Sequence, residues 1–209
     1  MFEKRLEAGE VLSQKLLKYK GVEGVLVLAI PRGGVVVGKA ISSKLNLHLD
    51  VLIVRKIGAP SQPELAVGAV GSGEEIVLDE KMINDLDVEE EYIQKEIEIK
   101  KHEVEEGIKK FRAEKPSLEL QGKQIILVDD GIATGATVEA AIKYLRHKKV
   151  KKLVLAVPVA PNNLVRKLKK LVDEILVLAA EDDFFAVGDF YRDFSQVTDE
   201  EVIQLLQND

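Results

Sequence analysis

The sequence contains no cysteine and no tryptophan among its 209 residues, and only 5% of its residues are aromatic. Without cysteine there is no disulfide framework, no cysteine-ligated zinc or iron–sulfur site and no thiol nucleophile. No run approaches the ~18 apolar residues that a membrane-spanning helix needs. Residues 1–5 lack the apolar core of a secretory signal. We therefore expect a cytoplasmic protein with no membrane partner.

The sequence also lacks an excess of positive charge. It has 36 acidic and 30 basic residues, which gives a formal net charge of −6. No overall field therefore attracts nucleic acid, and we expect no nucleic-acid partner. A hydrophobic fraction of 46% with 32% charged residues is typical of a globular protein. This length predicts a single domain over residues 1–209.

Five short apolar runs rich in valine, isoleucine and leucine predict buried strands. Continuous rather than alternating hydrophobicity is typical of parallel strands that are covered on both faces. Helix-period segments follow the first, third and fourth of these runs. The pattern predicts an α/β fold with a central parallel five-stranded sheet flanked by helices. The strands are expected at residues 25–30, 49–54, 124–128, 153–157 and 174–178, and the helices at 35–45, 137–148 and 162–171.

Two segments lie outside this repeat. Residues 2–19 predict an amphipathic helix with Leu6, Val11, Leu12, Leu16 and Leu17 on its apolar side. Residues 57–115 predict an insert before the strand at 124–128, formed by a flexible loop rich in glycine and proline and a long charged helix from about 88 to 112. We expect this helix to lie against the core or a sister subunit through a narrow apolar stripe, Ile93, Ile97, Val104, Ile108 and Phe111.

One segment carries most of the functional information. Asp129-Asp130-Gly131-Ile132-Ala133-Thr134-Gly135-Ala136-Thr137 follows the predicted strand at 124–128 directly, at the edge where α/β proteins bind ligands. Small residues let the backbone approach a ligand, and loop amides with a helix N-terminus bind anions such as phosphate. Adjacent carboxylates suit the neighbouring hydroxyls of a ribose. The segment therefore predicts a ribose 5-phosphate site, with an ordinary strand-to-helix turn as the alternative.

This segment resembles the phosphoribosyl-diphosphate motif of the type I phosphoribosyltransferases, nearly position for position. The resemblance implies that Asp129 and Asp130 hold the ribose hydroxyls. It also implies Mg²⁺ bound through the ligand, with the same two acids as candidate metal ligands. The core would span about 20–180, and a small hood over the base would come from about 1–20 and 180–209. The 5′-phosphate would be held by Gly131, Ala133, Thr134, Gly135, Ala136 and Thr137.

Two further segments resemble parts of the same family. Arg32-Gly33-Gly34 follows the first predicted strand and is similar to the pyrophosphate loop, where a guanidinium can donate to two oxygens at once. Residues 33–40 also look like a P-loop, but alanine stands at the position whose hydroxyl would ligate magnesium. Arg55 and Lys56 resemble the start of a mobile catalytic loop and would also contact pyrophosphate. Two solvated cations at a strand end are the alternative.

The acceptor site is less well defined. Residue 133 is alanine where family members that act on 6-oxopurines have an acid. Proton transfer would then need another group, such as Glu64, Asp182 or Asp183, or would not be needed. Phe184 and Tyr191 are aromatic candidates for stacking on a planar base, and Asp182 joins them as a base-site candidate. A hydrophobic plug or a dimer contact is the alternative for these rings.

The resemblance implies an enzyme that binds phosphoribosyl diphosphate and a small-molecule base. It would transfer the phosphoribosyl group and release pyrophosphate. The alternative is a catalytically silent sensor of phosphoribosyl diphosphate or nucleotides with the same fold. A homodimer or higher homo-oligomer is expected in either case. The candidate catalytic residues are Asp129, Asp130, Arg32, Lys56 and Glu64.

Overall fold

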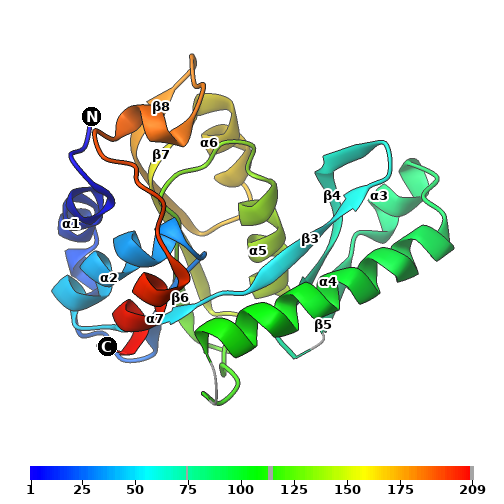
Figure 1. Cartoon of the computed structure of the whole chain (residues 1–209), viewed down its shortest axis with the longest axis horizontal. Coiled ribbons are helices and arrows are strands. Elements are labelled where there is room, and N and C mark those ends of the chain that lie inside the picture. Colours follow the sequence, from blue (N-terminus) through cyan, green and yellow to red (C-terminus); the bar gives the residue numbers. More distant parts are fainter. Residues whose placement is uncertain (74, 113–114, 208–209) are drawn as a thin grey trace. The chain divides into compact units, whose positions relative to one another are not determined.

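The computed structural model describes residues 1–73, 75–112 and 115–207. The chain divides into two units (Figure 1): unit 1 holds residues 1–52, 121–133 and 150–209, and unit 2 holds residues 53–120 and 134–149. The predicted insert and hood include residues 74, 113, 114, 208 and 209, which lie outside the described residues. The expectation of a single domain over 1–209 stays a prediction.

A five-stranded parallel sheet forms the centre of unit 1 (Figure 1). Its order is β2-β1-β6-β7-β8, and every neighbouring pair is parallel. The predicted parallel sheet is therefore confirmed. Because Ala29 pairs with Val128, β1 and β6 end side by side at the middle of the sheet. The strands are β1 (Val25–Ala29), β2 (His48–Val51), β6 (Gln124–Val128), β7 (Lys152–Pro161) and β8 (Glu174–Glu181).

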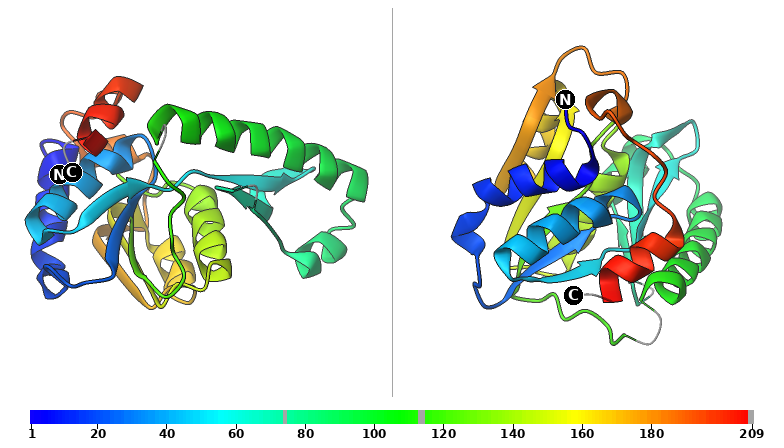
Figure 2. Two further views of the ribbon diagram at one scale, coloured as in Figure 1. Left: turned by 90° about the horizontal axis from the view of Figure 1, so that it is seen from below. Right: turned by 60° about the vertical axis from the view of Figure 1, so that its left-hand side comes forward.

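Helices cover this sheet. α1 packs along α2, α2 also contacts β1 and α7, and α6 packs on β7 and β8 (Figure 2). The stretch at 33–40 that looks like a P-loop is the regular start of α2. The helices of unit 1 are α1 (Arg5–Lys15), η1 (Leu17–Tyr19), α2 (Gly33–Leu45), α6 (Asn162–Leu168), η2 (Val187–Phe190) and α7 (Asp199–Gln207).

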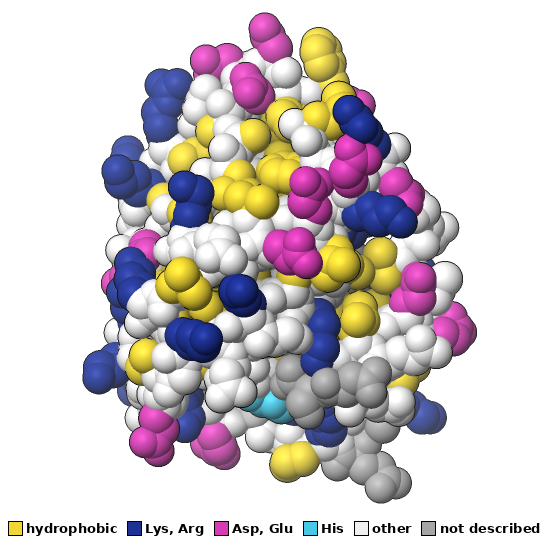
Figure 3. Space-filling model, turned by 90° about the vertical axis from the view of Figure 1, so that its left-hand side faces the viewer, with side chains coloured by type: hydrophobic (Ala, Val, Ile, Leu, Met, Phe, Trp, Pro, Cys, Tyr) yellow, Lys and Arg dark blue, Asp and Glu magenta, His cyan; other side chains and the backbone are white. Residues whose placement is uncertain are grey.

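The buried face of α1 differs from the predicted apolar side. Leu6, Val11 and Leu17 are exposed, and apolar side chains lie among charged ones on the face that α1 occupies (Figure 3). Leu12 and Leu16 of the predicted side are buried, and Arg5, Ala8, Gly9 and Ser13 are buried with them. The reason is close packing, since a Cβ added at Gly9 would lie 2.6 Å from Cβ of Ala40 on α2. Small residues, rather than the largest apolar ones, bring the two helices together.

Unit 2 contains an antiparallel sheet in the order β3-β4-β5. The hairpin of β3 and β4 replaces the flexible loop predicted after residue 57. Gly68 shows why, because a Cβ there would lie 2.9 Å from the carbonyl oxygen of Val77 on β5. The glycine reflects close strand packing, not flexibility. The elements are β3 (Val54–Ala59), β4 (Gln62–Gly71), β5 (Glu75–Leu78), α3 (Glu80–Asp85), α4 (Glu90–Phe111) and α5 (Ala136–His147).

The long charged helix α4 packs on β3 and β4. Ile93, Ile97 and Val104 of its predicted stripe are buried, which confirms that the stripe faces the protein's own core. Gly107 continues this contact, since a Cβ there would lie 2.8 Å from the side chain of Ile53. Among the described helices, none has the length and apolar character needed to cross a bilayer.

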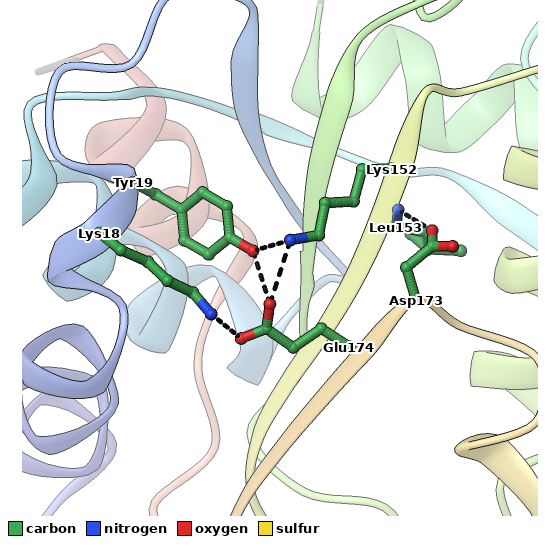
Figure 4. Close-up of polar contacts among 6 residues, drawn as sticks. All are labelled: Lys18, Tyr19, Lys152, Leu153, Asp173 and Glu174. Carbon is green, nitrogen blue, oxygen red and sulfur yellow. Dashed lines mark hydrogen bonds and ion pairs between the residues drawn. The ribbon is translucent and has the colours of Figure 1, made fainter.

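A polar cluster in unit 1 joins η1 to the starts of β7 and β8 (Figure 4). The Tyr19 hydroxyl donates to Oε2 of Glu174 at 2.7 Å and accepts from Nζ of Lys152 at 2.7 Å. Lys18 donates to the other carboxylate oxygen of Glu174 at 2.6 Å. Burial raises the pKa of Glu174, but the hydrogen bonds from Lys18, Tyr19 and Lys152 outweigh it and hold that pKa below its ordinary value.

This cluster predicts an acid-dependent loss of stability. A carboxyl group whose pKa is lowered by folding stabilises the native state above its ordinary pKa of 4.5, and this contribution is lost as the pH falls through the folded pKa. Glu174→Gln should lower the free energy of unfolding by about 1–2 kcal/mol at pH 7. The difference from the wild type should shrink as the pH falls below 4.5. Urea unfolding across this range measures both effects. Glu181→Gln, at the exposed end of the same strand, is the control.

Candidate functional site

The loops that follow β1 and β6 meet in unit 1. The Ile30 amide donates to the Val128 carbonyl at 2.9 Å, which brings the loop after β1 against the end of β6. A Cβ added at Gly34 would lie 2.9 Å from the Cα of Asp129. The peptide between Pro31 and Arg32 is cis, and α2 starts at Gly33. The structure thus brings the first predicted ribose acid into contact with the predicted pyrophosphate loop.

Asp130 is held from three sides. Nε of Arg5 donates to its Oδ2 at 2.5 Å, and the Tyr191 hydroxyl donates to its carbonyl oxygen at 2.6 Å. A Cβ at Gly33 would overlap the same Oδ2 atom, so only glycine leaves room for this carboxylate. Sequence reasoning missed Arg5. The sequence does carry one signal for it: at helical spacing, Arg5 lies on the same face of α1 as Ala8, Gly9, Leu12 and Leu16. All of these residues are buried in the structure.

The neighbouring acid, Asp129, is in a different electrostatic state. Burial raises the pKa of Asp129 well above its ordinary value, and the negative charge of Asp130 raises it further. The Asp130 amide donates to Oδ1 of Asp129 at 2.8 Å, which opposes this effect without reversing it. The site therefore disfavours the ionised form of Asp129 beside the charge of Asp130.

The first part of the predicted phosphate loop is held by protein contacts. A Cβ at Gly131 would overlap the side chain of Val187 and would lie 2.7 Å from that of Val159. The Ile132 amide donates to the Val159 carbonyl at 2.9 Å. Gly131 is therefore needed for packing against η2 and β7.

The second part of this loop belongs to unit 2 and leads into α5. Gly135 has a φ of 82°, in the left-handed region that favours glycine, and directly precedes the first helical residue, Ala136. Because Gly135 has no side chain, the N-cap residue itself makes no side-chain hydrogen bond to this helix. The first amides of an α-helix have no partner within the helix and attract anions. The start of α5, with Thr134 and Thr137 beside it in the sequence, has the chemistry of a phosphate site.

Three predicted or motif residues come together elsewhere in unit 2. Nζ of Lys56 on β3 donates to Oε1 of Glu64 on β4 at 2.8 Å. Hydrogen bonds from Lys56 and then from Thr134 hold the pKa of Glu64 below its ordinary value. Glu64 is thus ionised at neutral pH and is a weak base. Arg55 lies apart from this group, since neighbouring strand residues point to opposite faces, and its Nε pairs with Glu103 at 3.1 Å.

Comparisons with known proteins agree with these features. Residues 3–195 match the phosphoribosyl transferase domain family. The chain belongs to this family. The match covers the two acids after β6, the start of α2 and the hairpin of β3 and β4.

Individual relatives support the same assignment. The Mycobacterium tuberculosis protein Rv0571c, provisionally named a phosphoribosyl transferase, is 39% identical over 206 residues. This is 99% of the present chain but 46% of that protein, so the chain spans about half the length of the curated relatives it matches. The protein TT1426 from Thermus thermophilus has 38% identity and a TM-score of 0.92, with 100% of this chain and 98% of that chain covered.

A more distant solved structure shares the fold alone. It is a hypoxanthine-guanine phosphoribosyltransferase from Bacillus anthracis, with 14% identity and a TM-score of 0.50. The alignment covers 90% of this chain and 89% of that one. The fold is therefore that of a type I phosphoribosyltransferase, as the sequence predicts.

The predicted base-site residues lie in two settings. Tyr191 is buried, its ring stacks on Phe194 with centroids 5.1 Å apart, and Phe184 stacks on Phe190 at 5.1 Å. Tyr191, Phe184 and Phe190 pack with Ala8 and Val159 in one hydrophobic cluster, which is what the alternative of a hydrophobic plug predicts. Asp182 is exposed and lies 3.7 Å from Arg166.

Arg32, the predicted cation of the pyrophosphate loop, is partly exposed. It precedes the first residue of α2, and its Nη1 lies 3.8 Å from Oδ1 of Asp199 at the start of α7. Such a distant, solvated pair contributes little to stability. Arg32 is therefore available for an anion at the start of α2.

The contact at Gly34 yields a prediction. Gly34→Ala places a methyl group 2.9 Å from the Asp129 backbone and 3.0 Å from the Val128 carbonyl oxygen, so α2 must shift away from β6. We expect a loss of about 1–3 kcal/mol in the free energy of unfolding, measured by urea denaturation. Ser43→Ala, at an exposed position of the same helix, is the control and should change stability by less than about 0.5 kcal/mol. Equal stability of the two variants would contradict the close approach.

Proposed function

We propose that this protein transfers the 5-phosphoribosyl group from phosphoribosyl diphosphate to a nitrogenous base or related acceptor and releases pyrophosphate. The observation that carries the proposal is the contact between the paired acids after β6 and the glycines that begin α2. Carboxylates that can accept from a diol thus lie beside helix amides that can donate to a diphosphate. Membership of the phosphoribosyltransferase family supports the same reaction.

Asp129 and Asp130 would hold the two ribose hydroxyls, as carboxylate oxygens accept hydrogen bonds from neighbouring hydroxyls. The 5′-phosphate would bind the segment from Gly131 through Ala133 to Thr137. The start of α5 supports this assignment because its dipole and its amides favour an anion. No lysine is needed in this segment for phosphate binding.

Pyrophosphate would bind at the start of α2, where the amides of Gly33 and Gly34 and the Arg32 guanidinium can donate. Lys56 and Arg55 would add positive charge as the leaving group becomes more negative. In the structure, Lys56 forms an ion pair with Glu64, and Arg55 forms one with Glu103. Binding of a diphosphate would have to compete with those acids.

The acids also fit the Mg²⁺ that the family implies. The described residues hold no group of three or more acidic or histidine side chains that could bind a metal by themselves. Mg²⁺ commonly takes one or two carboxylates together with phosphate oxygens of its ligand and water. Asp129 and Asp130 would be the protein's contribution to that set. When bound, the ion would offset the negative charge of the diphosphate.

The protein's own part in the reaction would be to position the reactants and stabilise the leaving group. The acids orient the ribose so that the anomeric carbon faces the acceptor nitrogen, and the start of α2 receives the departing pyrophosphate. Glu64 would act through its hydrogen bond to Lys56, because its lowered pKa makes it a poor proton acceptor. Asp182, Phe184 and Tyr191 remain the acceptor-site candidates, of which Tyr191 would act by supporting the Asp130 carbonyl.

A sensor that binds phosphoribosyl diphosphate without turnover is a second candidate. It is supported by the residues predicted to bind the acceptor base. Phe184 and Tyr191 pack on other rings instead of standing free, and position 133 is an alanine that offers no acid. Pyrophosphate release measured against a panel of purines and pyrimidines separates the two functions. Release with any base supports the enzyme, and binding without release supports the sensor. For either function we also propose a cytoplasmic homo-oligomer.

The proposal predicts that Asp129→Asn/Asp130→Asn abolishes binding of phosphoribosyl diphosphate in the presence of Mg²⁺. Two neutral amides accept less strongly from the diol and supply no charge to a cation. We expect a loss of at least about 100-fold in affinity, that is about 2.7 kcal/mol. Isothermal titration calorimetry measures it.

The matched control is Asp85→Asn/Asp87→Asn, which removes the same two charges from exposed positions at and after the end of α3. It should bind like the wild type. Unchanged affinity of the Asp129→Asn/Asp130→Asn variant would refute the proposed ribose site. Thermal unfolding of both variants separates a lost site from a lost fold.

A further inference from the structure

Arg5 is a buried arginine on a helix that the family motifs do not include. Its residue is 9% exposed, although arginine is rarely buried unless it is paired. It lies in the first turn of α1, 125 positions before its acid partner in the sequence. Nothing in the proposed reaction uses it so far.

The guanidinium divides its donors between two segments. Nε donates to Oδ2 of Asp130 at 2.5 Å, and Nη1 donates to the carbonyl oxygen of Ser195 at 2.8 Å. Its central carbon lies 3.8 Å from the centre of the Phe194 ring, which is stacking geometry for an arginine on an aromatic face. Arg5 therefore joins α1 to the second motif acid and to residues 191–197, which we call the C-terminal strap.

The contact fixes Asp130 without using up its acceptor capacity. A carboxylate has about four lone-pair sites on two oxygens, and Arg5 contacts one oxygen through one N–H group. The Tyr191 hydroxyl of the same strap holds the Asp130 carbonyl. Both the side chain and the backbone of Asp130 are thus oriented by residues outside the motif.

The ion pair also borders the start of α2. A Cβ at Gly33 would overlap Oδ2 of Asp130 and would lie 2.8 Å from Nε of Arg5. The absence of a side chain at Gly33 therefore leaves room for the ion pair between Arg5 and Asp130. It also leaves room for an anion that approaches the Gly33 amide. This arrangement places Arg5 beside the ribose acids and the pyrophosphate loop at once.

Stability alone does not account for this choice of residues. A buried ion pair is often no more stabilising than apolar residues of similar volume, because both charges lose their hydration. In some proteins such a pair instead selects one conformation of the groups around it. Here Arg5 would fix the orientation of a carboxylate at the proposed ligand site.

We propose that Arg5 is a positioning residue of the ribose site, which holds the Asp130 carboxylate in the orientation that accepts a ribose hydroxyl. The proposal rests on the proposed function. It assigns part of the ribose specificity to the N-terminal helix and the C-terminal strap. It also predicts that binding of the sugar and binding of pyrophosphate respond differently to changes at residue 5.

The test compares Arg5→Met and Arg5→Lys with the wild type in calorimetric titrations of ribose 5-phosphate, phosphoribosyl diphosphate and inorganic pyrophosphate, all with Mg²⁺. Met keeps an apolar stem but loses the donors, while Lys keeps the charge but loses the planar fork. Neither side chain is larger than arginine, so neither replacement creates a steric overlap.

We expect Arg5→Met to weaken binding of ribose 5-phosphate and phosphoribosyl diphosphate by roughly 10- to 100-fold, with Arg5→Lys in between. Binding of pyrophosphate should stay within about twofold, a selectivity that a merely structural role would not produce. In the Asp130→Asn background, Arg5→Met should add less than about twofold, because the two residues act as one unit.

Arg192→Met is the matched control. Arg192 also joins the C-terminal strap to the N-terminal segment, through Glu3 at 2.6 Å, but it is exposed. It should leave all three affinities unchanged. If Arg5→Met does not fold, Phe194→Leu tests the same point, since it removes the ring against Arg5 and should weaken ribose 5-phosphate binding selectively, by about two- to fivefold.

The outcomes are distinct. Tighter ribose 5-phosphate binding by Arg5→Met would overturn the proposal and identify Arg5 as a latch that competes with the sugar. Equal losses for sugar and pyrophosphate, or no loss at all, would also overturn it. A wild-type protein that binds neither ribose 5-phosphate nor phosphoribosyl diphosphate would refute the proposed function itself, and with it the role of Arg5.

Discussion

Two adjacent carboxylates at the end of a central buried strand are the constraint around which unit 1 is organised. Charges placed there lose hydration and repel each other, so the fold must supply compensation from nearby. Arg5 supplies it for Asp130 as an ion pair. For Asp129, burial and the neighbouring charge of Asp130 raise the pKa, and the hydrogen bond from the Asp130 amide opposes this shift. The packing of α1 on α2, the glycines that begin α2 and the path of the strap all serve this arrangement.

Close approach of backbone segments is the second requirement. Gly34 lets α2 begin against the Asp129 backbone, and Gly131 lets the loop after β6 pack on Val187 and Val159. Gly9 plays the same part between α1 and α2. In each case a side chain is missing because another part of the protein occupies its space. The glycines of the motif are therefore structural as well as suited to a ligand that approaches the backbone.

The parallel sheet and the two acids after β6 could be predicted from the sequence because both signals are local. Continuous runs of β-branched residues predict covered strands, and the segment from Asp129 to Thr137 is specific at its length. The hairpin of β3 and β4 was not predicted because alanines and glycines of low strand propensity, such as Ala66 and Ala69, separate the buried valines of β4, Val67 and Val70. The glycines of this segment indicate a flexible loop, whereas the structure shows that Gly68 allows close packing on β5.

Helical spacing aligns Arg5 with Ala8, Gly9 and Leu12, but no local pattern identifies its partner, because Asp130 lies 125 positions further along the sequence. The apolar side of that segment was predicted only in part, because Leu12 and Leu16 are buried whereas Leu6, Val11 and Leu17 are exposed. Only the tertiary structure shows that the narrow face of small residues ends in an arginine directed at Asp130.

A binding acid must be tolerated by the fold whether or not its ligand is bound. A cation that belongs to the chain compensates that acid permanently, whereas a metal that arrives with a diphosphate does so only in the complex. This difference in timing would explain why the proposed Mg²⁺ site keeps an arginine against one of its carboxylates.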